Sequence, residues 1–375
     1  MTLKVDTITD VAGTGAPNAT DGITVGGTAL SSVNQMEYTS SATEPNNPAN
    51  GAVWWNTGDE KIYYYVNDGW YEIDSTPPPI YYGDTGVFAG GGSVDGANYY
   101  NIIQSVTIST TGNATDFGNL VSARKELAGC SNGSRGIYGA GRGSSITFAI
   151  DYITFATSGN GTNFGNLSFS RYNLSSCSDG LRGVFAGGFQ FSVTNVIDYV
   201  LIATTGSAND FGDLDITTAG GNQTTACADK TRGLIAGGLN SSSVSQNAIQ
   251  YITIQTTGNT TDFGDLLAAA ANMGSCSDDT RGVFAGGTTS AAQNVIQYVT
   301  IQTTGNATDF GDLTAVRDKA TGISNGTRGI LGGGSQAATA LTIDYFTIQT
   351  PGNASDFGDL SAGQPLNYMG GASGD

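Results

Sequence analysis

The feature that most constrains the fold of this chain is an eight-residue motif that occurs six times at a nearly constant interval. Its copies are NATDFGNL from residue 113, NGTNFGNL from 160, SANDFGDL from 207, NTTDFGDL from 259, NATDFGDL from 306 and NASDFGDL from 353. The central phenylalanines are separated by 47, 47, 52, 47 and 47 positions. A period of this size indicates one supersecondary unit that buries its hydrophobic face only by stacking against its neighbours.

Two other segments recur in phase with the motif, and both are strand-like. One is RGVFAGG, at residues 281 and 182, with RGLIAGG at 232, RGILGGG at 328, RGIYGAG at 135 and TGVFAGG at 85. The other is NVIQYVTIQTTG at 294, with related segments at 195, 247 and 341. With the motif itself and a segment before each RG pair, every unit has four short strands rich in β-branched and aromatic residues. This pattern predicts an all-β chain whose units are the blades of a six-bladed β-propeller.

The two ends of the array are complementary. It opens on GVFAGG at residue 86 without a preceding strand, and it ends on PLNYMGGASGD after Leu360. In three of the units, counting ten residues on from the motif leucine gives Cys276, Ile323 and Gly370. We therefore expect the C-terminal strand to complete the first unit and to close the ring, leaving no open sheet edge.

The four cysteines have the spacing of the repeat. Cys130, Cys177, Cys227 and Cys276 each precede the arginine of an RG pair by five positions, and Ile323 takes this place in the next unit. Disulfides or zinc sites need pairs or local CxxC spacing. Replacement by isoleucine instead predicts a buried core position with a free thiol.

Composition excludes several kinds of chemistry. The net charge is −18, with 14 Lys and Arg and no histidine, so we expect no nucleic-acid partner and no Ser-His-Asp or Cys-His site. Glu126 is the one glutamate after residue 79, so few general acids or bases are available there. Apolar runs such as VIQYVTI are too short to span a membrane, and the amino terminus lacks a signal-peptide pattern. We predict no catalytic residue, no metal site and no cofactor.

The repeated motif still has three possible roles. Its two aspartates and one asparagine could bind Ca²⁺ or Mg²⁺ weakly, although the pattern of a calcium loop is absent. Two carboxylates could also act as the acid/base pair of a glycosidase. The favoured interpretation is structural: Gly and Asn shape a turn, Phe and Leu pack between blades, and Asp caps backbone amides.

The residues before the repeats form a different region. Residues 1–38 alternate polar and apolar side chains without a core of their own, and we expect them to need partner chains to become ordered. Residues 39–76 hold Trp54, Trp55 and Trp70 and predict a small aromatic β-meander with turns at TGDE and NDG. Prolines at 77–79 make a stiff linker to the repeat domain at 80–375.

Two resemblances to known families follow from these segments. The units resemble kelch repeats, with Gly286 and Gly287 as the glycine pair, then Tyr298, Phe310 and Leu313, although Phe stands where kelch units usually have Trp. The run KVDTITDVAGTGAP resembles the amino-terminal stretch of phage tail fibres, notably of cyanophages, and GAVWWNTGDEKIYYYVNDGWYEI resembles a module of phage tail proteins. The second resemblance implies a virion appendage with an attachment arm, which is often trimeric, and a distal domain that meets the host.

The predicted function is therefore a virion tail-fibre protein, located in the tail or fibre appendage, whose propeller binds a host cell-surface glycan or protein without being an enzyme. The arm at residues 1–38 would join other virion proteins and form a homotrimer. A polysaccharide depolymerase on the same scaffold and a purely structural head or tail decoration protein are the alternatives. Segments after the glycine pairs vary most between units, so we predict ligand-binding residues among them: Tyr99, Tyr100, Arg142, Phe189 and Phe191.

Overall fold

The computed structural model describes residues 3–4, 24–25, 28–29, 38–46, 48, 52–57, 61–66, 69–74, 83–217, 220–336, 340–361 and 366–374. These residues form strands, bridges and turns and contain no helix, so within them nothing is a helix long and apolar enough to cross a membrane. The chain divides into two compact units, Met1–Pro77 and Pro78–Asp375. The proline linker predicted at 77–79 lies outside the described residues, and the finer division of the first unit stays a prediction.

The first unit contains a five-stranded sheet with the order β1-β7-β6-β5-β4. Strands β5 (Val53–Asn56), β6 (Lys61–Val66) and β7 (Gly69–Asp74) form the predicted antiparallel meander. Strand β4 (Tyr38–Ser41) pairs in parallel with β5, and β1 (Leu3–Lys4) pairs in parallel with β7. Strands β2 (Thr24–Val25) and β3 (Thr28–Ala29) pair with each other. Most of the predicted arm and of the two predicted turns lies outside the described residues.

Aromatic packing explains why this short sequence forms a sheet. Trp54 is buried, and its ring lies 5.1 Å from that of Tyr63 and 5.6 Å from that of Trp70. Its Nε1–H donates to the carbonyl oxygen of Ser41 at 3.0 Å, which fastens β4 to β5. A large ring with a satisfied polar atom is well suited to the centre of so small a sheet.

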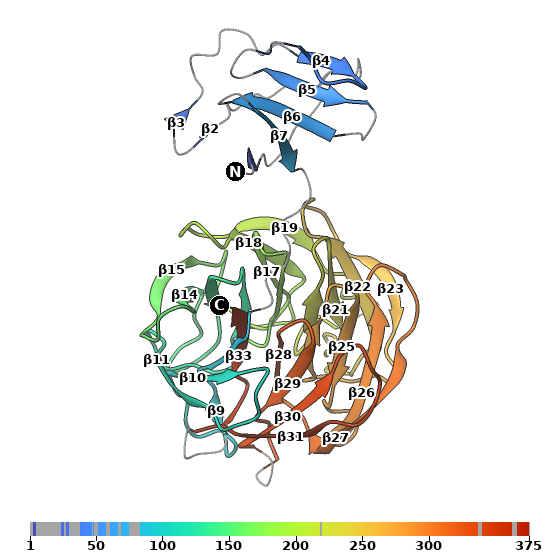
Figure 1. Cartoon of the computed structure of the whole chain (residues 1–375). Coiled ribbons are helices and arrows are strands. Elements are labelled where there is room, and N and C mark those ends of the chain that lie inside the picture. Colours follow the sequence, from blue (N-terminus) through green and yellow to red (C-terminus); the bar gives the residue numbers. More distant parts are fainter. Residues whose placement is uncertain are drawn as a thin grey trace. The chain divides into compact units, whose positions relative to one another are not determined.

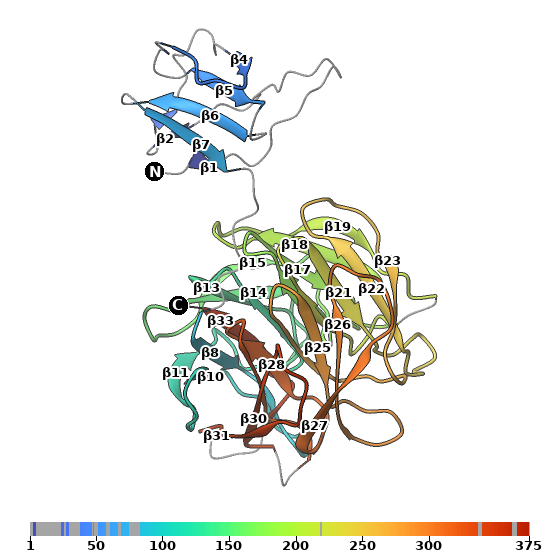
Figure 2. The same ribbon diagram turned by 45° about the vertical axis from the view of Figure 1, so that its right-hand side comes forward.

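The second unit contains six four-stranded antiparallel sheets, consistent with propeller blades (Figures 1 and 2). We number them along the chain, and each is given from its innermost strand outward. The first sheet is β33 (Gly370–Gly374), β8 (Thr85–Ala89), β10 (Ile102–Thr107) and β11 (Thr115–Asn119). The second is β12 (Ala128–Ser131), β13 (Arg135–Gly139), β14 (Ala149–Thr154) and β15 (Thr162–Asn166). The third is β16 (Ser175–Ser178), β17 (Arg182–Ala186), β18 (Val196–Leu201) and β19 (Asn209–Asp213).

The remaining three sheets repeat this order. The fourth is β20 (Thr225–Ala228), β21 (Arg232–Ala236), β22 (Ala248–Thr253) and β23 (Thr261–Asp265). The fifth is β24 (Gly274–Ser277), β25 (Arg281–Ala285), β26 (Gln293–Thr300) and β27 (Thr308–Arg317). The sixth is β28 (Thr321–Ser324), β29 (Arg328–Gly332), β30 (Thr342–Thr347) and β31 (Ser355–Asp359). A short pair, β9 (Gly92–Ser93) with β32 (Leu366–Asn367), adjoins the first sheet.

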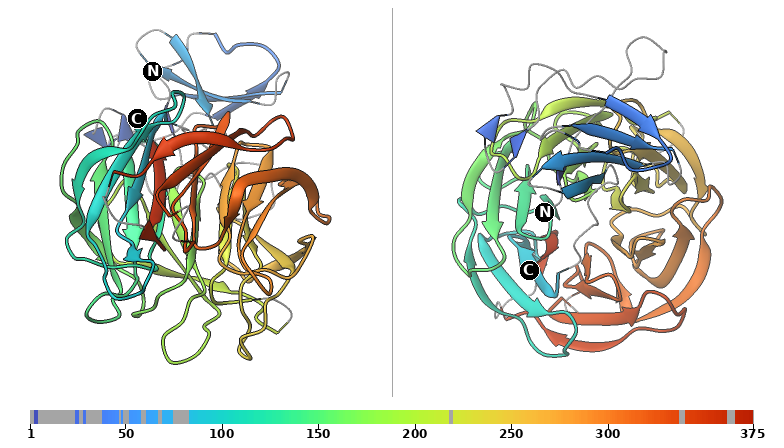
Figure 3. Two further views of the ribbon diagram at one scale, coloured as in Figure 1. Left: turned by 90° about the horizontal axis from the view of Figure 1, so that it is seen from below. Right: turned by 45° about the horizontal axis from the view of Figure 1, so that its top comes forward.

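The first sheet is assembled from both ends of this unit. Strand β33 pairs with β8 over the whole of its length, from Gly370 opposite Ala89 to Gly374 opposite Thr85. The predicted pairing of the C-terminal segment with the first unit is therefore confirmed. The innermost strands lie next to one another in the order β33, β12, β16, β20, β24, β28, and β28 also contacts β33. Figure 3 shows the six sheets disposed around a common axis.

Serine hydroxyls join the innermost strands to one another. Ser131 donates to the carbonyl oxygen of Ser373 at 2.6 Å, and Ser178 donates to that of Ser131 at 2.5 Å. The same contact is made by three further serines to the strand before each of them, and these are Ser277, Ser324 and Ser373. Ala228 occupies the sixth place. These bonds tie strands that have no ladder hydrogen bonds between them.

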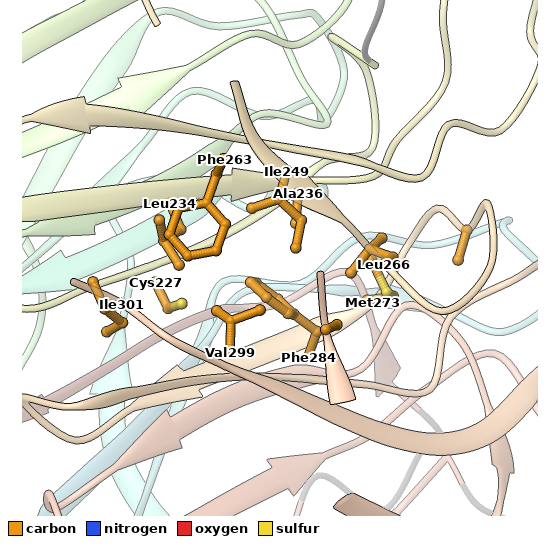
Figure 4. Packing of buried hydrophobic residues seen from close by; sticks show 12 residues of the cluster. Cys227, Leu234, Ala236, Ile249, Phe263, Leu266, Met273, Phe284, Val299 and Ile301 are labelled. Carbon is orange, nitrogen blue, oxygen red and sulfur yellow. The ribbon is translucent and has the colours of Figure 1, made fainter. Parts of the chain in front are cut away.

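The hydrophobic core consists of layers between neighbouring sheets. Figure 4 shows one layer, in which Phe263 and Leu266 of the repeated motif pack with Cys227 of the fourth sheet and Phe284 of the fifth. The ring of Tyr251 meets that of Phe263 edge-on at 6.3 Å. The prediction that the motif's Phe and Leu pack between neighbouring sheets is confirmed.

The predicted capping of backbone amides by the motif's aspartates is wrong. Its central aspartates, such as Asp262 and Asp309, are exposed. The backbone amide of one motif is instead capped by the asparagine of the next: Asn306 Oδ1 accepts from the N–H of Asp265, and Asn353 Oδ1 from that of Asp312, both at 3.0 Å. The asparagine begins the turn that faces the preceding sheet, whereas the aspartate side chain points to solvent.

All four cysteines are free and buried, as predicted. Each thiol packs against the glycine of the RG pair in the following sheet. A Cβ atom placed on Gly282 would lie 2.7 Å from the Sγ of Cys227, too close for any side chain. The RG pair recurs in part because its glycine leaves room for this sulfur.

Candidate functional site

The candidate site lies at one end of the sheet assembly, where the chain enters each innermost strand. We call the few residues before each innermost strand a lead-in segment. Six residues occupy the same place in the six lead-in segments: Glu126, Asn173, Gln223, Asn272, Lys319 and Tyr368. All six line one cavity of about 130 Å³, and we call this end the mouth.

A circuit of main-chain hydrogen bonds fixes the backbone of the mouth. The N–H of Asn173 donates to the carbonyl oxygen of Glu126 at 3.0 Å, and the N–H of Glu126 donates to that of Tyr368 at 2.9 Å. The other four bonds continue in the same direction and return to the start. Each of the six residues has a φ angle between 55° and 62°, a left-handed conformation that non-glycine residues rarely adopt. The circuit stabilises this conformation whatever the side chain.

This uniform backbone bears five different kinds of side chain at its six positions. One is a carboxylate, two are asparagines, and the others are a glutamine, a lysine and a tyrosine. Together with the variable loops after the glycine pairs, these positions are where the repetition of the chain is broken. A ligand that binds here would meet a single arrangement of groups rather than six equal ones.

The variable loops that follow the glycine pairs lie beside the lead-in segments. Arg142 bridges to Lys125, Phe189 to Tyr172, Leu239 to Asn222 and Thr288 to Ala271. Strand β9 pairs with β32, and the N–H of Ser335 donates to the carbonyl oxygen of Asp318 at 2.9 Å. All six loops therefore share the face of the mouth.

A second cavity of about 210 Å³ lies at one side of the mouth. It is lined by the second and third sheets and by the lead-in segments on either side of them, and it shares four lining residues with the first cavity. We call it the side cavity. Arg142 and Glu126 form an ion pair at its wall: Nη2 of Arg142 donates to Oε1 of Glu126 at 2.7 Å, and Nε approaches Oε2. Burial lowers the pKa of Arg142, but the hydrogen bond and the charge of Glu126 outweigh it and raise this pKa above its ordinary value. Arg142 therefore remains charged, and the carboxylate of Glu126 is already paired with it.

Aromatic rings form a second wall of the side cavity. The rings of Tyr172 and Phe189 lie 5.7 Å apart and are tilted by 56°. The guanidinium of Arg142 lies 4.7 Å from the centre of the Tyr172 ring, which is a cation–π contact. Tyr368 also lines this cavity, and burial raises its pKa, so its hydroxyl is protonated at neutral pH.

Two asparagines of the side cavity have an unused acceptor. Asn173 and Asn222 are each only 9% exposed, and both line the cavity. The Oδ1 atom of each is buried and accepts no hydrogen bond from the residues that the structure describes. A buried acceptor without a donor costs about 1–3 kcal/mol, so such atoms are commonly satisfied by water or by a ligand.

The structure brings together two of the five residues that the sequence predicted for ligand binding. Arg142 and Phe189 line the side cavity. Tyr99 is partly exposed beside the second sheet, Tyr100 packs against the hydrophobic core of the first sheet, and Phe191 is 90% exposed and does not line the cavity. Sequence reasoning missed Glu126, Tyr172, Asn173, Asn222, Gln223 and Tyr368, because it searched the loops after the glycine pairs and not the lead-in segments, where aligned units also differ.

The mouth does not have the arrangement of a hydrolytic acid/base pair. Glu126 is paired with Arg142, and Asp318 lies 3.8 Å from Lys319 and accepts a hydrogen bond from Thr288. Among the described residues, no three carboxylate or thiol groups converge as metal ligands. The groups at the mouth suit recognition by stacking and hydrogen bonding.

Comparison of the chain with models of known protein families found no match. A search of curated proteins likewise found no similar sequence. The function of the mouth therefore has to be inferred from its geometry and from the residues that line it.

Proposed function

We propose that residues 80–375 form a closed, six-bladed, kelch-like β-propeller that acts as a non-enzymatic binding module. Pairing of β33 with β8 supports closure, and so do bonds between the sixth and first sheets. Arg328 Nη1 donates to the carbonyl oxygen of Ile108 at 3.1 Å, and Asn113 Oδ1 accepts from the N–H of Asp359 at 3.0 Å. In a closed ring every sheet has two neighbours and none presents a free face.

One observation carries the binding function. Six equivalent backbone positions at the mouth, held by one circuit of hydrogen bonds, bear five different kinds of side chain. A fold made of six similar units gains nothing in stability from such variety. A binding surface gains specificity from it, because an asymmetric ligand needs different contacts on each side.

We further propose that the module belongs to a virion tail or fibre appendage and binds a host cell-surface glycan. Support comes from the sequence run KVDTITDVAGTGAP and the tryptophan-rich module after it, which resemble phage tail-fibre segments. In this proposal the arm at residues 1–38 joins the chain to other virion proteins and holds three copies together. The mouth is then the surface offered to the host.

A glycan array tests this proposal. The full chain is applied to immobilised bacterial surface polysaccharides, and soluble samples of the same polysaccharides are assayed for released reducing ends. We expect binding to at least one polysaccharide without release. Release of reducing ends would establish a depolymerase instead, and absence of binding to every polysaccharide would leave a structural role in the virion.

A further inference from the structure

We propose that the side cavity binds one neutral hexopyranose unit of the recognised glycan. This inference rests on the proposed function and adds to it the place of the site and the class of sugar. It follows from three properties of the cavity: an aromatic wall, unused hydrogen-bond acceptors and, among the described residues that line it, no charge without a partner.

The aromatic wall suits the apolar face of a pyranose ring. Phe189 and Tyr172 are half-buried and held side by side by the bridge between their backbones, with Tyr172 N–H donating to the carbonyl oxygen of Phe189 at 3.0 Å. Rings fixed in this way offer contact area at little cost in conformational entropy. The C–H face of a hexopyranose can lie against Phe189, whereas the Tyr172 ring is partly covered by the guanidinium of Arg142.

The buried acceptors call for a ligand with hydroxyl donors. Oδ1 of Asn173 and Oδ1 of Asn222 belong to neighbouring lead-in segments that line the same cavity. Two hydroxyl groups on one sugar ring can donate to two such acceptors at once. A site with unpaired buried acceptors discriminates strongly against ligands that lack these hydroxyls.

The charges around the cavity are already paired. Arg142 binds Glu126, whose side chain is 2% exposed, and a sugar carboxylate could take Arg142 only by leaving that glutamate buried and unpaired. On the far side of the mouth Lys319 lies beside Asp318. The binding surface is therefore close to neutral, although the chain as a whole carries a net charge of −18. Both facts disfavour an acidic sugar.

The size of the cavity limits the ligand to one ring. Its volume of about 210 Å³ is below the range of roughly 300–1,000 Å³ typical of pockets for drug-sized ligands. Further sugars of a chain would extend over the mouth, towards Gln223 and Asn272, whose side chains are joined by a 2.8 Å hydrogen bond.

The test uses the full chain and simple sugars as probes. Methyl glycosides of glucose, galactose and mannose are compared with glucuronic acid by saturation-transfer NMR and by calorimetric titration. We expect at least one neutral glycoside to bind more tightly than glucuronic acid. This comparison uses the unmodified protein, so it remains decisive if a variant does not fold.

Variants then locate the site. Phe189→Ala and Asn222→Leu should each weaken the Kd for the bound glycoside about tenfold or more, which corresponds to about 1.4 kcal/mol. Phe191→Ala is the matched control, because it removes an exposed phenylalanine two positions away in the same loop and should bind as the unmodified chain does. Unchanged binding by both cavity variants, or preference for glucuronic acid, overturns the inference. Failure to bind any polysaccharide on the array would instead overturn the proposed function.

Discussion

At the residue scale, one buried position is an aspartate in some of the six sheets and a glutamine in the others. It holds Asp151, Asp198 and Asp344 in three sheets and Gln104, Gln250 and Gln297 in the other three. Each of these side chains accepts a hydrogen bond from the N–H that follows a motif leucine, as Asp198 does from Ser168 at 3.1 Å and Gln297 from Leu267 at 2.8 Å. The acceptor is always present, and only its charge changes.

A second position changes together with the first. Each aspartate has an arginine partner, as Arg171 lies 3.1 Å from Asp198 and both are fully buried. In the fifth sheet, where the buried position holds Gln297, Ala270 takes the place of the arginine. Its carbonyl oxygen accepts a hydrogen bond from a glycine N–H, as the arginine carbonyl oxygen does at the equivalent positions. Burial lowers the pKa of Arg171, and the charge of Asp198 opposes this. An unpaired ion at this depth is costly, so the pair is kept or lost as a whole.

This pairing predicts the behaviour of a single and a double variant. Asp198→Gln keeps the acceptor for Ser168 but leaves Arg171 buried without a counter-ion, and should lower the free energy of unfolding by about 3–5 kcal/mol. The double variant Arg171→Ala with Asp198→Gln copies the arrangement of the fifth sheet and should recover most of that loss. Urea unfolding of the three proteins measures both effects. A double variant that is less stable than Asp198→Gln alone would contradict the explanation.

The thiols allow a second prediction at this scale. Burial raises the pKa of Cys177 to about 12 and raises those of the other three cysteines as well. Because the reactive species is the thiolate, the folded protein should not react with a disulfide reagent at pH 8. All four cysteines should react once the chain is unfolded in guanidinium. Rapid reaction of even one thiol in the folded protein would show that the layer between its sheets is open.

At the scale of the elements, the repeated motif is a connector between sheets. Five of its six copies begin with an asparagine whose Oδ1 accepts from the preceding sheet, at 3.0 Å in every case, and these are Asn113, Asn160, Asn259, Asn306 and Asn353. The exception is Ser207, which is too short to make this contact. The connector between the third and second sheets therefore lacks this side-chain hydrogen bond.

Two substitutions test the connector. Asn306→Ala should lower the free energy of unfolding by about 1–2 kcal/mol, since it removes a hydrogen bond and leaves the Asp265 amide without its partner. Ser207→Asn should instead raise it by about 0.5–1.5 kcal/mol, because it supplies the missing acceptor at an exposed position. Chemical denaturation reports both. Destabilisation by Ser207→Asn would mean that this copy of the turn has a different local geometry.

Prediction from the sequence was accurate where information is repeated. The six sheets, the place of the C-terminal strand and the buried thiols all follow from patterns that occur several times, so an error in one copy is corrected by the others. The asparagine connector was missed because its two partners belong to different copies, and nothing in one copy shows where the side chain points. Most of the mouth was missed for the opposite reason: Glu126 and Tyr368 occupy equivalent places but share no chemistry.

At the scale of the whole second unit, the stability of the fold depends on the first sheet, because the innermost strand of this sheet, β33, comes from the C-terminal end of the unit. Deleting residues 361–375 removes β33. This exposes the edge of β8 that β33 pairs with, and it removes the contacts of β33 with the innermost strands of the two neighbouring sheets. We expect the shortened chain to aggregate or to lose its cooperative thermal transition. A synthetic peptide of residues 361–375, added in trans, should restore the transition. A shortened chain that melts like the full one would remove the argument for closure.

The same strand pairing governs how the chain can be made in the cell. Residue 85 leaves the ribosome long before its partner, residue 374, is translated. Every other sheet can assemble as soon as its own residues emerge, whereas the first must wait with one edge of the apolar strand β8 unpaired. Such late, non-local pairing slows folding and lengthens exposure to aggregation. Yield at high expression should therefore be limited by the interval between translation of β8 and translation of β33, and slower synthesis should lower it.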